Sequence, residues 1–289
     1  MRIAAMQPIG RFFCGIFLCL VLSLACWTEP GFGAVFELHK RQGESLRSAE
    51  ELPGSFAEGD ALRVVGEYPL ESGDWEIVRN LLGSAEGPCA LELNDATTHI
   101  PERALYTCPG LGSLRAAQVT VVKAEAFEGC AALASVFLPA LAEIGESAFY
   151  DCDSLLEASM PKVAIIGDHA FSSCGSLREV AMPLAVSVGQ MAFSGCTDLA
   201  DASLPDAETI GDSAFSDCAS LESVSLPKAT QIGSAAFSGC FTLRSASIPK
   251  AKTVGDGAFS GCAELRKLNM PKSAVLGEDV FEGCEKLKL

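Results

Sequence analysis

The sequence predicts a solenoid, a β-rich stack of short coils, because three residue types recur with a fixed step of 22 positions. Cysteine keeps this step from Cys130 to Cys284, and leucine keeps it three places later, from Leu133 to Leu287. Phenylalanine keeps it through eight copies without insertion or deletion: Phe127, Phe149, Phe171, Phe193, Phe215, Phe237, Phe259 and Phe281. A repeat of this length cannot bury its apolar face alone, so successive units are expected to stack in one row.

The first half of each unit has the pattern of a short strand that ends at a proline. Its apolar residues are first three and then two positions apart, as in Leu133, Val136 and Leu138. This change of spacing is expected where a chain enters a strand whose alternate residues point inward. Proline follows at position 139 and recurs as far as 271; it has no N–H to donate, so we expect it to end the strand. Each coil then adds one strand to a parallel sheet.

The second half of each unit predicts another extended segment and a turn. Its inner end carries a β-branched residue in six copies: Ile144, Ile166, Val188, Ile210, Ile232 and Val254. The glycine that follows each of them is expected to supply unusual backbone angles. Alanine precedes phenylalanine in seven copies, which predicts a tight helical turn. Stacked coils would place the phenylalanines in an interior ladder with a spacing of about 4.8 Å.

The unit reads C-x2-L-x2-[VAL]-x-[LMI]-P-x4-[IVL]-G-x2-[AV]-F-x2-C. It resembles the BspA-like, or treponemal-type, bacterial leucine-rich repeats, whose units carry the signature IG-x2-AF-x2-C-x2-L-x2-V-x-LP. The resemblance is strong over residues 105–289 and looser before them. It implies a right-handed leucine-rich-repeat solenoid, horseshoe-like and β-rich, with short helical turns. Proteins of this type are surface or periplasmic, and several are adhesins for host matrix proteins or other cells.

Residues 1–33 are expected to be a signal peptide, because Arg2 and Arg11 accompany an apolar run at 12–25 that is too short for a membrane span. Residues 31–33 fit ordinary signal peptidase, whereas residues 22–26 resemble a bacterial lipobox with its leucine one place early. The second alternative would anchor the chain to a membrane through lipid. Either form places the mature protein at the cell surface, in the outer membrane or in the periplasm.

Three further segments are predicted. Residues 34–60, rich in Glu, Ser and Gly, are expected to be a loosely attached leader or linker. Residues 61–104 are expected to form an N-terminal cap with a strand near 62–65 and an amphipathic helix over 74–82 that ends at Gly83. Residues 105–289 would be the leucine-rich repeats. The chain ends at Leu289 in mid-coil without a recognisable capping element, so end-to-end dimerisation is a further expectation.

The cysteines are expected to be core residues. Nine of them share one phase of the repeat, so each would face its two neighbours in the stack and pack as a small hydrophobic residue. Cys89 is out of phase, which leaves a Cys89–Cys108 disulfide open. No Cys-x-x-Cys or Cys/His cluster indicates zinc.

No catalytic, metal-binding or cofactor-binding residue is predicted, and the chain is not expected to be an enzyme, because no triad or phosphate loop is present. An acidic residue often follows the repeated glycine, and we interpret it as an N-cap of the helical turn rather than a metal ligand. These residues are Glu146, Asp168, Asp212, Asp256 and Glu278.

Partners are expected to be proteins, either host extracellular-matrix or cell-envelope components. The formal net charge of -16 repels phosphate backbones and excludes nucleic acid. Candidate partner-binding residues occupy variable positions on and beside the first strand: Phe137, Arg178, Glu222, Arg244, Arg266 and Lys267. Two functions remain open, surface adhesion or host-component binding, and a periplasmic scaffold with bacterial partners.

Overall fold

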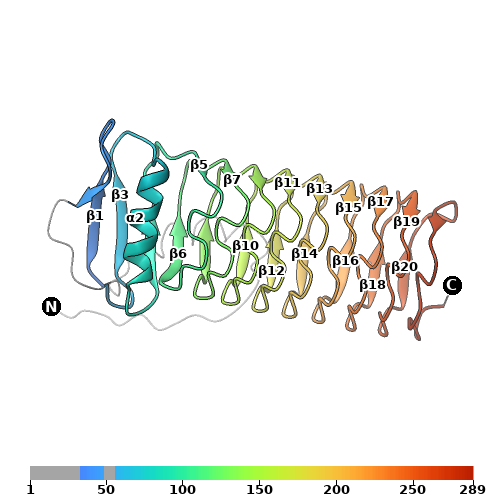
Figure 1. Ribbon diagram of the computed structural model, residues 1–289. Coiled ribbons are helices and arrows are strands. Elements are labelled where there is room, and N and C mark those ends of the chain that lie inside the picture. Colours follow the sequence, from blue (N-terminus) through green and yellow to red (C-terminus); the bar gives the residue numbers. More distant parts are fainter. Residues whose placement is uncertain (1–32, 49–55, 289) are drawn as a thin grey trace, which may run out of the picture. The chain divides into compact units, whose positions relative to one another are not determined.

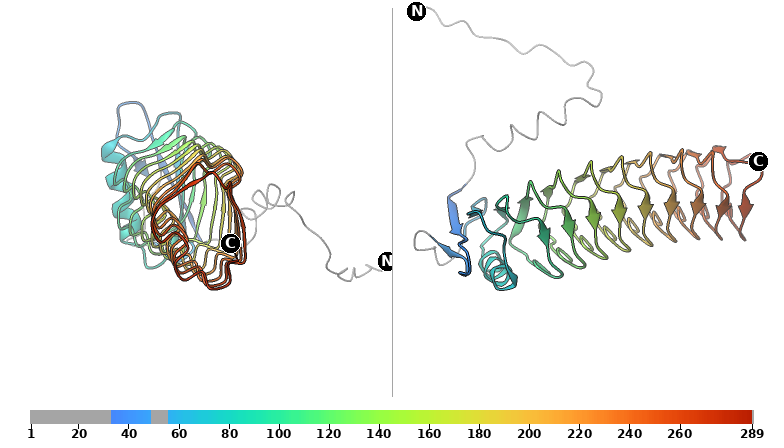
Figure 2. Two further views of the ribbon diagram at one scale, coloured as in Figure 1. Left: turned by 90° about the vertical axis from the view of Figure 1, so that its right-hand side faces the viewer. Right: turned by 90° about the horizontal axis from the view of Figure 1, so that it is seen from above.

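The computed structural model describes residues 33–48 and 56–288, which form one row of stacked coils (Figure 1). The predicted signal peptide, apart from Gly33, and both of its processing sites lie outside these residues. Each repeat contributes one strand to each of two walls, and the strands within each wall run parallel in the repeats. The coils superpose around a shared interior when viewed along the row (Figure 2). The predicted leucine-rich-repeat solenoid is confirmed, with repeats of about 22 residues and about 11 turns.

The first wall carries the strand that sequence analysis placed before the proline. Its order is β2-β1-β3-β4-β6-β8, followed by β10-β12-β14 and β16-β18-β20. All pairs are parallel except β1 with β2. The strands are β1 (Val35–His39), β2 (Arg47–Ser48), β3 (Ala61–Val65), β4 (Cys89–Glu92), β6 (Leu111–Arg115), β8 (Ser135–Phe137), β10 (Glu157–Ser159), β12 (Glu179–Ala181), β14 (Asp201–Ser203), β16 (Ser223–Ser225), β18 (Ser245–Ser247) and β20 (Lys267–Asn269).

The second wall is a continuous nine-stranded parallel sheet made of the β-branched segments. Its strands are β5 (His99–Ile100), β7 (Val121–Val122), β9 (Glu143–Ile144), β11 (Ile165–Ile166), β13 (Ser187–Val188), β15 (Thr209–Ile210), β17 (Gln231–Ile232), β19 (Thr253–Val254) and β21 (Val275–Leu276). The second residue of each strand from β5 to β19 is buried, while the first is exposed or half-buried. The alternation follows from the period of two in a strand.

The phenylalanines form the predicted interior ladder. Adjacent rings from Phe127 to Phe281 lie 5.0 to 6.0 Å apart between centroids, with planes 3° to 19° from parallel. All of them from Phe127 to Phe259 are fully buried. Stacking at the coil spacing therefore continues the aromatic core through the whole repeat region.

The cysteine thiols are buried but are not merely apolar filler. In eight coils the Sγ atom donates a hydrogen bond of 3.0 to 3.2 Å to the carbonyl oxygen 25 residues earlier, which belongs to the phenylalanine position of the preceding coil. Each thiol thus has a hydrogen-bond acceptor at its site and links its coil to the preceding one. Cys89 and Cys108 are free thiols, so the disulfide alternative is not realised.

Burial holds these thiols in the neutral form. It raises the pKa of Cys108 to about 11 and the pKa values of Cys130 and Cys240 to about 12. Burial is also the largest cause that raises the pKa values of Cys196 and Cys218 well above the ordinary value. At Cys196 and Cys218 no cation among the described residues offsets the loss of water around a thiolate, and at Cys108 the nearby Arg79 offsets it only in part.

The repeated glycine has a different role from the one expected. The glycines from Gly145 to Gly277 in this column do not have positive φ; instead, a Cβ there would meet the backbone of the preceding coil. At Gly233 that Cβ would lie 2.5 Å from Asp212 N and 2.5 Å from Gly211 C. The prediction of unusual backbone angles was wrong because close approach between coils, not chain reversal, demands glycine here.

Replacing Gly233 with alanine is expected to destabilise the protein by about 1 to 3 kcal/mol, because two backbone segments must separate to admit one methyl group. Gly175→Ala is the matched control, since the nearest atom to its added Cβ would be 3.8 Å away. Urea unfolding of both variants measures the difference. Equal stability of the two variants would show that the coils yield easily at this position.

The segment before each phenylalanine is a tight turn, as expected, closed by hydrogen bonds between residues three apart, such as the one from Ala148 N–H to Gly145 O. Its positive φ falls on the second residue after the glycine, as in Ser147 at 52° and His169 at 56°. Within the described residues, the repeats contain no helix, so the acidic residues that follow the repeated glycine do not cap one. Instead, Asp168, Asp212 and Asp256 each accept, through Oδ1, a backbone N–H from the next coil at 2.7 to 2.8 Å. These carboxylates tie coils together.

The cap begins earlier than predicted. Strand β1 pairs in parallel with β3, and β2 pairs with β1, so the expected linker over residues 34–60 is wrong for residues 34–48. Buried Lys40 explains part of this, because its Nζ lies 2.8 Å from Oδ2 of Asp74 in helix α2 (Ser72–Gly83). Asp74 also accepts the N–H of Leu46, which fixes the loop between β1 and β2 to the helix. A polar composition therefore concealed an ordered segment.

Candidate protein-interaction surface

The outward side of the first wall, here called the strand face, presents two columns of side chains. In the three-residue strands the middle residue points inward, and the first and third residues point outward. The first column runs Ser135, Glu157, Glu179, Asp201, Ser223, Ser245 and Lys267. The third column runs Phe137, Ser159, Ala181, Ser203, Ser225, Ser247 and Asn269. Packing inside the solenoid does not restrict which residues occupy these two columns.

At its N-terminal end the strand face carries alternating charges on four adjacent strands. Arg63 lies between Glu37 and Glu92, with an Nε–Oε2 distance of 2.7 Å to Glu92, and Arg115 Nε lies 3.8 Å from Oε1 of the same glutamate. The Arg115 guanidinium then covers the Phe137 ring, with its carbon 4.5 Å from the ring centroid. Phe137 is half-buried and ends this ladder, so it is not a free aromatic anchor.

The other five predicted residues lie on the strand face, from the middle to its C-terminal end. Arg178, Glu222, Arg244 and Arg266 share one column immediately before the strands, and Lys267 begins β20. Glu222 and Arg244 form an ion pair at 3.2 Å, whereas no described ion pair includes Arg178 or Lys267. Arg266 pairs with Glu264 at 2.8 Å. The structure therefore brings these five together along one face and separates Phe137 from them.

Three carboxylates in the first column were not predicted from the sequence. Glu157, Glu179 and Asp201 occupy registered positions on adjacent strands, and all three side chains are exposed. None of the ion pairs among the described residues includes them. Like charges directly opposite one another destabilise a sheet, so this acidic ladder has no stabilising role within the coil stack. Its signal in the sequence is three acids at a step of 22 residues, which is weak beside the eight-copy columns of buried residues.

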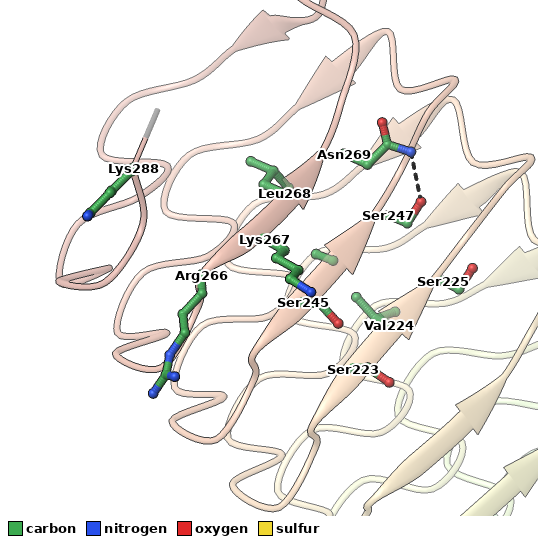
Figure 3. Close-up of a pocket in the computed structure, with 11 residues that line it drawn as sticks. Ser223, Val224, Ser225, Ser245, Ser247, Arg266, Lys267, Leu268, Asn269 and Lys288 are labelled. Atoms are coloured by element: carbon green, nitrogen blue, oxygen red, sulfur yellow. Dashed lines mark hydrogen bonds between the residues drawn. The ribbon is translucent and has the colours of Figure 1, made fainter.

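A shallow depression of about 570 Å³ lies over β16, β18 and β20 (Figure 3). Its floor is formed by small side chains, including Ser225 and Ser247, and its rim by Arg266, Lys267 and Lys288. Asn269 donates to the Ser247 hydroxyl at 3.1 Å. Hydroxyl and cationic groups share this open surface with apolar groups such as Leu268, and it offers hydrogen-bond donors without an enclosed cavity for a small molecule.

Over residues 33–48 and 56–288, no group of three or more His, Cys, Asp or Glu side chains is placed to hold a metal ion. Among those same residues, no helix has the length and apolar character needed to span a membrane. The chemistry that the described surface offers is hydrogen bonding and ion pairing along a long, rigid face.

The solved structures to which the chain is similar include two bacterial leucine-rich repeat proteins. A leucine-rich repeat protein from Bacteroides ovatus ATCC 8483 is 21% identical, with a TM-score of 0.47 over 86% of this chain and 78% of that one. The leucine rich repeat protein of T. pallidum is 28% identical, with a TM-score of 0.39 over 69% of this chain and 78% of that one. None of the curated proteins compared with the chain matches it.

The family profile of the BspA type leucine rich repeat region matches residues 89–200 and 164–288, in six copies. These matches span most of the chain and include every repeat whose columns are described above. The chain therefore belongs to the BspA-type leucine-rich repeat family.

Proposed function

We propose that this chain is an exported binding protein that uses its strand face to hold another protein in cell-surface adhesion. The observation that supports the proposal most strongly is that the repeat keeps its buried positions constant and lets its exposed strand positions vary. The repeated phenylalanine, cysteine and leucine columns are buried, while the exposed strand positions vary in charge and size. A leucine-rich repeat protein is suited to protein–protein interaction, because its stacked coils present an extended and rigid surface.

The proposed contacts are the exposed charged residues between β12 and β20: Arg178, Glu222, Arg244, Arg266 and Lys267. Phe137 is a weaker candidate, because Arg115 already covers its ring. Export is proposed from the apolar run at residues 12–25 with Arg2 and Arg11. A partner among host extracellular-matrix proteins fits an outward-facing location.

The second candidate function is a periplasmic scaffold with partners from the cell envelope. The third column favours it, because Ser159, Ala181, Ser203, Ser225 and Ser247 lack the large aromatic anchors typical of tight binding hot spots. Such a face suits weak, repeated contacts with neighbours that are present at high concentration.

Protease treatment of intact producing cells separates the two functions. Adhesion predicts that external protease removes the protein without breaking the cells, and that an antibody to it labels the cell surface. A Cys26→Ser variant released from the membrane would additionally identify the lipid anchor. Full protection from protease, lost only after the envelope is opened, would contradict adhesion and support the scaffold.

A further inference from the structure

Charge on the strand face is divided between its middle and its C-terminal end. The middle carries the acidic ladder of Glu157, Glu179 and Asp201, none of which belongs to an ion pair among the described residues. The C-terminal end carries Lys267 and Lys288, which likewise belong to no described ion pair and lie on the rim of the depression. One face therefore presents two unsatisfied regions of opposite sign.

The surface between these two regions is smooth. Ser223 and Ser225 of β16 and Ser245 and Ser247 of β18 project only hydroxymethyl groups, and they line the shallow depression (Figure 3). Strands β16, β18 and β20 are registered residue by residue, so the outward columns run straight across them. A second flat surface can approach these serines closely. If that surface also carries serines, their hydroxyl groups would contact the hydroxyl groups of β16 and β18.

We propose that a second copy of this chain covers this face in antiparallel orientation. A two-fold axis that runs parallel to the strands, between β16 and β18, reverses the order of the coils in the second copy. Asp201 of each copy then faces Lys267 of the other, and Glu222 faces Arg244. Because a two-fold interface is self-complementary, every one of these pairs occurs twice.

The Glu222–Arg244 pair supports this arrangement. Within one copy its atoms lie 3.2 Å apart, and both side chains are 59% exposed. Across the axis the two pairs combine into a ring of four alternating charges. Asp201, at the C-terminal end of the acidic ladder, receives Lys267 of the partner in the same way, which offsets its repulsion from Glu179 on β12.

The association is expected to be weak and reversible. The contact from β14 to β20 spans four strands, or roughly 19 Å, which places the interface at the small end of specific contacts. The net charge of -16 on each copy also opposes approach at long range. The inference stands apart from the proposed adhesion, but a dimer of this kind would compete with any other protein for the same face.

Charge reversal of each half tests the pairing. The acid-reversed variant is Asp201→Lys, and the base-reversed variant is Lys267→Glu. The matched control is Glu208→Lys, which makes the same charge change as the acid-reversed variant at an exposed position beside the nine-stranded sheet. Circular dichroism checks that each full chain is folded, and sedimentation equilibrium measures its mass over a wide concentration range at physiological salt.

The wild type and the control are expected to show a concentration-dependent dimer. Each reversed variant alone should remain monomeric, because its copies meet like charge with like charge. An equimolar mixture of the two reversed variants should recover the dimer, since the heterodimer pairs lysine with glutamate at every reversed contact. A monomeric wild type at high concentration overturns the proposal. So does a dimer that survives both reversals, as end-to-end contact would, or a mixture that stays monomeric.

Discussion

Raising the pH from 7 to 10 is expected to unfold the solenoid in dilute buffer. An ordinary cysteine pKa is about 9, whereas burial raises the pKa of Cys108 to about 11 and those of Cys130 and Cys240 to about 12. The folded state therefore keeps its protons at pH 10 while the unfolded state releases them. Stability is fully present below pH 9 and falls as the pH rises through 9 to 11, by roughly 1 kcal/mol per buried thiol for each pH unit.

The loss of stability at high pH is large because the repeat places a buried thiol in successive coils. At least seven buried thiols have strongly raised pKa values, Cys108, Cys130, Cys152, Cys196, Cys218, Cys240 and Cys262. Together they imply a loss on the order of 10 kcal/mol at pH 10, which matches the whole stability of a typical domain. Urea unfolding followed by circular dichroism in the presence of a reductant measures the free energy of unfolding across this pH range.

A Cys196→Ala/Cys218→Ala variant separates proton linkage from packing. It loses two hydrogen bonds to carbonyl oxygens and is expected to be less stable than the wild type at pH 7. Above pH 9 the variant should release about two fewer protons on unfolding than the wild type, so its free energy of unfolding should fall less steeply with pH. An unchanged slope would contradict the account, because it would mean that these thiols ionise equally in both states.

Truncation of one ring of the phenylalanine ladder is expected to be the costliest single substitution. Phe193 is fully buried and stacks on Phe171 at 5.3 Å and on Phe215 at 5.1 Å between centroids. Phe193→Ala leaves a cavity in the stack and removes both ring contacts, at a cost of about 3 to 5 kcal/mol.

Phe241 provides the control within the same chain. Its side chain is 55% exposed in a turn, so Phe241→Ala should change stability by less than about 0.5 kcal/mol. Thermal or urea unfolding of both variants gives the comparison. If Phe193→Ala proved as mild as Phe241→Ala, the ladder would not be what couples neighbouring coils.

The sequence was sufficient to predict what the repeat period determines. Three columns at one step of 22 residues imply stacked coils, and stacking by itself places Phe193, Cys196 and Leu199 inside. Contacts between coils were harder to predict. The glycine column and Asp212 both act on a neighbouring coil, so a pattern read along one unit assigned them local roles in turns and caps.

The candidate surface was predicted only in part, because nothing in the repeat fixes the exposed residues. Arg244 and Lys267 were recognised as variable and charged, but the Arg115 contact that occupies Phe137 depends on the register between β6 and β8. Register also aligns Glu157, Glu179 and Asp201, which are 22 residues apart and unremarked within their own units. The ordered leader was missed because Lys40 finds its partner, Asp74, far along the chain.

Site-specific photocrosslinking in the producing cell tests most directly whether the strand face is the binding surface. A photoreactive residue replaces Ser203 or Asn269 on the strand face, and Gln231 on the nine-stranded sheet serves as the control; all three side chains are exposed. We expect covalent adducts with other proteins from Ser203 and Asn269, identified by mass spectrometry, and none from Gln231. Adducts from Gln231 alone would contradict the assignment of binding to the strand face.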